Sequence, residues 1–124
     1  MKNMPGDATP EIPESESRIR GISMIDHWNT EEDGPFSEPV LRKKLEKKGY
    51  DVTRYVYSPG THFPDHSHAI DKIDAVVSGR FRMTMRGQSV ILEAGDCLVV
   101  PCGTLHSAEV VGNESVVSLD ATKE

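Results

Sequence analysis

Three histidines stand in two short segments rich in glycine and proline, and their spacing favours a metal site. His66 and His68 have one residue between them, so on an extended strand their side chains point to the same face. His106 follows a Pro-Cys-Gly turn that would aim its side chain from a second strand. Imidazoles placed in this way can bind one face of a divalent metal and leave positions open for water or a substrate. We therefore predict that His66, His68 and His106 ligate a divalent transition metal.

The glycines and the proline around these histidines resemble the two motifs of the cupin family. The first motif, G-x5-H-x-H-x3,4-E-x6-G, is matched by Gly60, His66, His68 and Gly79. The second motif, G-x5-P-x-G-x2-H-x3-N, is matched by Gly95, Pro101, Gly103 and His106, with Val110 at the position of the final Asn. The resemblance covers roughly residues 51–120. It implies a double-stranded β-helix, or jelly roll, with the metal inside the barrel.

One position departs from the family pattern. Lys72 stands where the family usually has a metal-binding Glu, and Ile73, at the alternative spacing, cannot ligate either. A protonated lysine has no free lone pair for a metal. Asp74 lies on the same strand face as Lys72 and is the nearest replacement acid. Lys72 could face solvent, pair with Asp74 or Asp71, or hold an anionic group of a ligand, so Lys72 and Asp74 are candidate pocket residues.

Other residues near the motifs could line a pocket. His62 lies off the motif positions and could be an entrance residue. Cys102 lies in the turn that the cupin register puts near the metal, where it could be a pocket or redox-sensitive residue. Met83 and Met85 alternate with Thr84, which is typical of a core or, if they face inward, of an apolar pocket wall.

Composition and charge limit the class of protein. The chain has 124 residues, which suits one domain with a modest core. Its net charge of −6 at pH 7 argues against nucleic acid as a partner. The two cysteines show no CxxC spacing, which suits a reducing compartment. The first ten residues lack an apolar signal segment, and no apolar run is long enough to span a membrane, so we expect a cytoplasmic protein.

The composition of the chain predicts three parts. We expect residues 1–17 to be a flexible, acidic, proline-containing arm. We expect residues 18–50 to be a strand and helix segment that packs on a barrel of residues 51–120. In the middle part, Ile19–Met24 could be a first strand lent to a partner subunit, and Asn29–Pro35 is predicted as a loop. Ser37–Lys48 is predicted as the one short helix, since Ser37 can cap it and Gly49 follows it.

From residue 51 onward, short runs rich in Val, Ile, Tyr and Thr alternate with turn residues. The candidate strands are 51–58, 62–68, 72–78, 80–86, 89–93, 97–100, 105–111 and 115–119. Their regular spacing predicts an all-β sandwich or barrel. Together with the resemblance, this gives a double-stranded β-helix, the jelly roll or cupin barrel, with one short N-terminal helix.

Segment 72–78 gives two conflicting indications of which face is buried. Alternation alone would turn its apolar face, formed by Ile73, Ala75 and Val77, toward the barrel interior. The cupin register turns Lys72 and Asp74 inward instead. Both hold if the apolar face packs against a second subunit, so we predict a homodimer with Ile73, Ala75 and Val77 at its interface.

These features predict a small cupin metalloenzyme that acts on a small polar or anionic organic molecule. Some cupin dioxygenases use only three histidines, so oxygen-dependent cleavage is the leading chemistry. The alternative is a non-catalytic cupin that binds or senses a small ligand, which the replacement of the family acid by Lys72 favours. The metal can be Fe, Mn, Ni, Co, Cu or Zn, because imidazole accepts all of them. The expected partners are a small molecule and a second subunit, with neither nucleic acid nor membrane.

Overall fold

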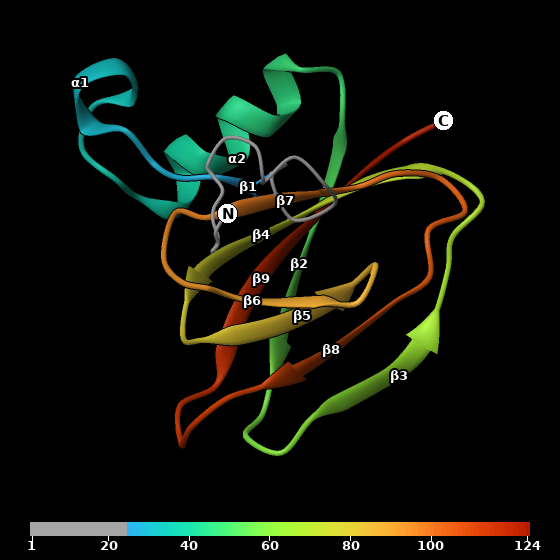
Figure 1. The fold of residues 1–124 in the computed structure, drawn as a ribbon. Helices are drawn as coiled ribbons and strands as arrows, with labels where there is room; N and C mark the ends of the chain where they lie inside the picture. Colours follow the sequence, from blue (N-terminus) through green and yellow to red (C-terminus); the bar gives the residue numbers. More distant parts are fainter. Residues whose placement is uncertain (1–24) are drawn as a thin grey trace, which may run out of the picture.

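Two antiparallel β-sheets face each other in the computed structural model, which describes residues 25–124. One sheet has the strand order β1-β7-β4-β9-β2, and the other has the order β3-β8-β5-β6. Both helices lie on the outer side of the five-stranded sheet, away from the four-stranded one (Figure 1). The arrangement confirms the all-β jelly roll.

The predicted strands from residue 51 onward are all found, but the strand predicted over 62–68 ends at His66, so His68 lies outside it. The strands are β1 (Ile25–Asp26), β2 (Asp51–Tyr57), β3 (His62–His66), β4 (Asp71–Ser78), β5 (Phe81–Met85), β6 (Gln88–Leu92), β7 (Cys97–Val100), β8 (His106–Val110) and β9 (Val116–Lys123). The last strand continues to Lys123, past its predicted end at residue 119. The short strand β1 was not predicted, and it pairs with β7. The first strand expected at Ile19–Met24 lies outside the described residues.

The predicted helix is confirmed as α2 (Glu38–Lys47). Ser37 caps it, because its hydroxyl accepts a hydrogen bond from the Val40 amide at 3.3 Å. Leu41 and Leu45 lie on one face of this helix and are fully buried against the sheet. The cap and the apolar spacing therefore fix both where the helix begins and which face it buries.

A second helix, α1 (Thr30–Asp33), occupies the segment that was predicted as a loop, so the expectation of a single helix is wrong. The Asn29 side chain accepts hydrogen bonds from the Glu31 and Glu32 amides at 2.9 and 3.3 Å. The acidic residues Glu31, Glu32 and Asp33 lie in its first turn, where they interact favourably with the helix dipole. One turn of helix is too short for apolar periodicity to reveal.

Strand β4 has its two faces in different cores. Ile73 and Ala75 are buried under α2, in a cluster with Leu41 and Leu45, and Val77 packs against that cluster. The prediction that this face meets a second subunit is therefore wrong, because a helix of the same chain covers it. The opposite face turns Lys72 and Asp74 inward, as the cupin register requires.

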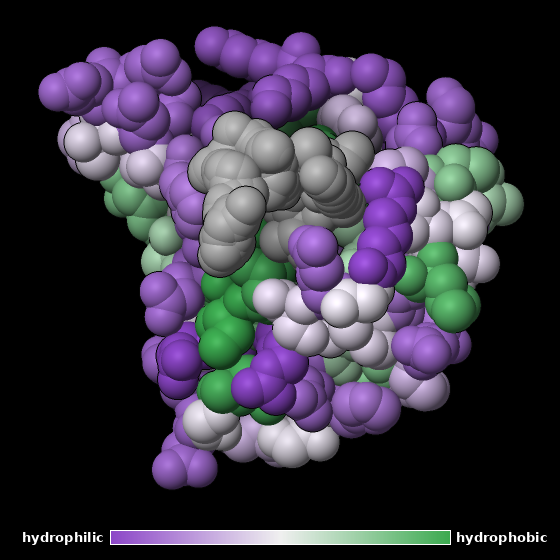
Figure 2. All heavy atoms as spheres, in the orientation of Figure 1, coloured by the Kyte–Doolittle hydropathy of each residue, from purple (hydrophilic) through white to green (hydrophobic). Residues whose placement is uncertain are grey.

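The second core fills the space between the sheets. Its buried residues are Val76, Phe81, Met83, Met85, Leu92, Leu98, Val100, Ala108, Val110 and Val116. Hydrophilic residues cover most of the face visible in Figure 2, and hydrophobic residues are confined to smaller areas. Across residues 25–124, the helices are too short to cross a membrane.

Candidate metal centre

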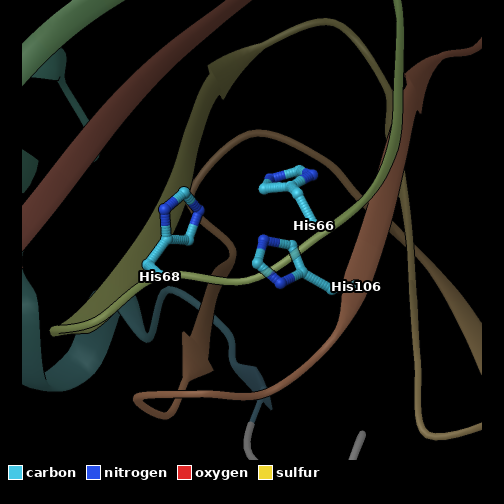
Figure 3. Close-up of side chains that lie close together, drawn as sticks. All are labelled: His66, His68 and His106. Atoms are coloured by element: carbon cyan, nitrogen blue, oxygen red, sulfur yellow. The ribbon is translucent and has the colours of Figure 1, made fainter.

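The three predicted ligands come together at one end of the barrel. His66 ends β3, His68 lies in the following loop, and His106 begins β8. His66 and His106 are direct partners across the β3–β8 pair. One nitrogen from each ring lies within 4.8 Å of the others, and the ring centroids are 4.2 to 5.1 Å apart. Figure 3 shows the rings close together, projecting from two separate segments of the chain.

The hydrogen bonds of these rings leave nitrogens available to a metal. The His66 Nδ1–H donates to the Pro64 carbonyl at 2.7 Å, and the His106 Nδ1–H donates to the Thr104 carbonyl at 2.9 Å. These bonds favour the tautomer in which Nε2 carries a lone pair. The Nε2 atom of His68 is buried and has no hydrogen-bond partner among the described residues. A buried polar atom normally has a partner, so the Nε2 atom of His68 is suited to bind a metal ion.

The electrostatics favour neutral imidazoles. Burial lowers the pKa of both His68 and His106, and the Lys72 ammonium lowers each further. A histidine ligates a metal only in its deprotonated form, so these shifts reduce the competition between protons and a metal. The donor set, its tautomers and its charge state are all suited to a divalent transition metal.

Lys72 faces inward and is held by two carboxylates. Its ammonium lies 2.9 Å from the Asp120 carboxylate and 3.3 Å from that of Asp74. The ion-pair interpretation of Lys72 is thus the one that the structure shows, with Asp120 as an additional partner. Asp71 instead accepts a hydrogen bond from the Cys102 amide at 3.0 Å. Ser118 donates to the other Asp120 oxygen at 3.1 Å and so orients that carboxylate.

Burial and pairing act in opposite directions on this ion cluster. Burial lowers the pKa of Lys72, but Asp74 and Asp120 outweigh it, so the pKa is raised overall and the ammonium stays charged. Burial raises the pKa of Asp74, and the Lys72 ammonium only partly opposes it. The pKa of Asp74 is therefore raised overall.

A cavity of about 190 Å³ lies beside the histidines and the ion cluster. Part of its lining is an aromatic wall, in which the Tyr57 ring packs on Phe63 at 5.0 Å and on Phe81 at 5.5 Å between centroids. Met83 and Ala108 complete this wall. Burial, with the nearby carboxylates of Asp120 and Asp74, raises the pKa of Tyr57, so its hydroxyl keeps its proton.

The remaining candidates lie elsewhere. His62 is on the outer side of the four-stranded sheet, in a small depression with Arg82 and Glu109, away from the histidine cluster. Cys102 is exposed, and it does not line the cavity. Met83 lines the cavity, whereas Met85 belongs to the core between the sheets.

Several cavity residues were missed by the sequence analysis. Tyr57, Phe63 and Phe81 lie on strands that were predicted, but nothing in their spacing marks them as pocket residues. Asp120 lay beyond the predicted end of its strand, although it is the direct partner of Asp74 across β4 and β9. The inward parity of β9, extended past residue 119, is the signal that could have found it.

The motif resemblance is supported by comparison with known sequences. Residues 53–122 match the family described as Cupin domain. Since this match spans more than half of the chain, the protein belongs to the cupin family. A cupin-2 domain containing protein from Shewanella frigidimarina has the same fold, with a TM-score of 0.52 and 24% identity. That superposition covers 60% of this chain and 71% of the other protein.

Two curated relatives are both acireductone dioxygenases. The chain is 28% identical to the one from Leishmania major over 138 residues, and 27% identical to the one from Leishmania braziliensis over 106 residues. These alignments cover 94% and 72% of this chain but only 39% and 30% of the relatives. The chain thus spans less than half the length of these curated relatives.

Proposed function

We propose that this cupin is a small metalloenzyme that acts on a small polar or anionic organic molecule by dioxygenase-type chemistry. A divalent transition metal would be held by His66, His68 and His106. The observation on which the proposal rests is the buried, unpartnered Nε2 of His68 beside the other two rings. The names of the two curated relatives favour a dioxygenase among the possible cupin enzymes.

Different residues of the chain would bind the metal, orient its ligands and contact the substrate. The bound metal would supply Lewis-acid chemistry and a place for substrate and dioxygen to meet. The carbonyls of Pro64 and Thr104 orient His66 and His106. The Tyr57 hydroxyl, which keeps its proton, can donate a hydrogen bond to a ligand oxygen. The aromatic wall would exclude water from one side of the bound ligand.

The alternative is a cupin that binds or senses a ligand without catalysis. The two carboxylates that line the cavity among the described residues, those of Asp74 and Asp120, both pair with Lys72 and so do not act as the usual fourth ligand. An open three-histidine site with an adjacent cavity suits a substrate, so the enzyme is favoured.

The free thiols of Cys97 and Cys102 suit the proposed cytoplasmic location.

The metal site is tested by elemental analysis of the purified protein. We expect close to one divalent transition metal per chain in the wild type, and loss of most of it in His66→Ala and in His106→Ala. His62→Ala is the matched control, since His62 lies on the outer side of the sheet and should leave the metal content unchanged. Equal metal content in the wild type and all variants would contradict the site.

A further inference from the structure

The cavity beside the histidines has two chemically different walls. One part of the lining consists of the histidines and the cluster of Lys72, Asp74 and Asp120. The other part consists of aromatic rings from three strands, among them Phe63 and Phe81, whose centroids are 6.3 Å apart. An entirely polar ligand would leave the aromatic wall in contact with water, and an entirely apolar one would desolvate the charged wall. A ligand that fills the cavity therefore needs a polar head and an apolar tail.

The size of the cavity restricts the length of that tail. Its volume is about 190 Å³. Cavities that hold drug-sized ligands run from about 300 to 1,000 Å³. The ligand is thus a compact molecule, with room for one head group and a short chain.

The ion cluster restricts the charge of the head. Lys72 has no charge left over for a ligand, because two carboxylates surround its ammonium at 2.9 and 3.3 Å. The three side chains are nearly buried, with exposures of 13, 7 and 15% for Lys72, Asp74 and Asp120, so their charges are weakly screened. With both carboxylates ionised, the cluster has a surplus negative charge. A second negative charge on a ligand would be repelled where it lies beside this cluster rather than at the metal.

We infer that this site selects compact monoanionic oxygen chelators with a short apolar tail, such as 2-oxo acids with an alkyl chain. The head would bind at the histidine face, and the tail would pack on Phe63, Tyr57 and Phe81. Asp74 and Asp120 discriminate against dianions. This inference rests on the proposed metal site.

The test is a binding titration of the Co(II)-loaded protein, followed through the visible absorption of the metal. Three probes distinguish the effect of the apolar tail on affinity from the effect of a second charge. They are pyruvate, 2-oxopentanoate and 2-oxoglutarate. We expect 2-oxopentanoate to bind about tenfold more tightly than pyruvate, because it buries two more methylenes. It should also bind at least about tenfold more tightly than 2-oxoglutarate, which has the same chain length but a second carboxylate.

Variants test which residues cause the preference for an apolar tail and which cause the discrimination against a second carboxylate. Phe63→Ala should remove most of the preference for 2-oxopentanoate over pyruvate, and Phe63→Leu, which keeps an apolar side chain, should retain part of it. Val40→Ala is the matched control, because Val40 is 38% exposed, lies on α2 and does not line the cavity. Asp120→Asn should weaken the discrimination against 2-oxoglutarate and leave the preference for the apolar tail.

The outcomes separate this inference from the proposed function. A protein that holds no Co(II) would overturn the metal site and this inference with it. A protein that holds Co(II) but binds all three probes equally would overturn the inference alone. Tighter binding of 2-oxoglutarate than of 2-oxopentanoate would also overturn it, since Lys72 would then be available to a second carboxylate.

Discussion

Lys72 is the residue that most separates this site from the usual cupin pattern. Restoring the family acid with Lys72→Glu adds a carboxylate and removes a positive charge near the metal. We expect metal retention against a chelator to tighten by roughly tenfold. The measurement is a parallel chelator titration of the wild type and the variant.

Lys72→Met is the control for this change. It removes the charge but adds no ligand, so any gain in metal retention beyond it belongs to the new carboxylate. Both variants break a buried ion pair, and each should lose about 3 kcal/mol or more of unfolding free energy in the metal-free state. Identical metal retention in the wild type and Lys72→Glu would mean that position 72 does not reach the metal, and would contradict the prediction.

The sequence predicts the clustering of the three histidines well and the rest of the cavity poorly. The motif spacing brings His66, His68 and His106 together, although His68 lies in the loop after β3 and strand alternation therefore does not set its direction. The partner of Lys72 could not be found in this way. Asp120 is distant in the chain, and only the register of β4 on β9 brings it to Lys72. Spacing within a segment contains no information about register between segments.

The turns between strands determine how the sheets close. Gly79 and Gly60 both have positive φ angles, 84° and 89°, which favour glycine. A Cβ at Gly79 would lie 2.4 Å from the Ser115 carbonyl oxygen, whereas a Cβ at Gly60 meets nothing within 4 Å among the described residues. We expect Gly60→Ala to lower the unfolding free energy by about 1 to 2 kcal/mol through strain alone. Gly79→Ala should lower it by roughly 3 kcal/mol or more, because the clash with backbone adds to that strain.

Denaturant unfolding of both variants measures this difference. The two substitutions make the same chemical change at nearly the same backbone conformation, so Gly60→Ala corrects Gly79→Ala for the cost of the φ angle. Equal losses of stability would show that the β4–β5 turn can move away from Ser115.

Elements long enough to show periodicity were predicted, whereas the single-turn helix α1 was not, although Asn29 caps it. Helix α2 has a capping serine and two leucines one helical turn apart, whereas α1 is a single turn. The apolar outer face of β4 was identified, but its cover was assigned to a second subunit. Periodicity predicts that a face is buried but not which element covers it. Here the covering element is α2, which packs on Ile73 and Ala75.

At the scale of the whole molecule, the jelly roll follows from the number and spacing of strands and from the two motifs. What the sequence does not give is the division of the strands between two sheets. Strands β4 and β9 are far apart in the chain yet adjacent in the five-stranded sheet. This long-range pairing helps to form the cavity, because it brings Lys72 and Asp120 together in its lining.

Strand β2 is an edge of the five-stranded sheet among the described residues. We propose a homodimer, now formed through strand β2 rather than through the outer face of β4. Among the described residues, β2 has a neighbouring strand on one side only, and it exposes Tyr55 and Val56 at 46 and 55%. An open edge strand with apolar side chains can pair with a second copy about a two-fold axis. Light scattering should then report about twice the chain mass of 13.7 kDa.

A charge placed on this edge should weaken the dimer. Val56→Lys puts an ammonium group where two copies of β2 would meet, and the like charges of the two subunits would lie close together. We expect the mass measured by light scattering at micromolar concentration to fall toward that of a monomer. Leu105→Lys is the matched control, because Leu105 is also exposed, at 59%, but does not lie on β2. A monomeric wild type, or a dimer that Val56→Lys leaves intact, would contradict pairing through this edge.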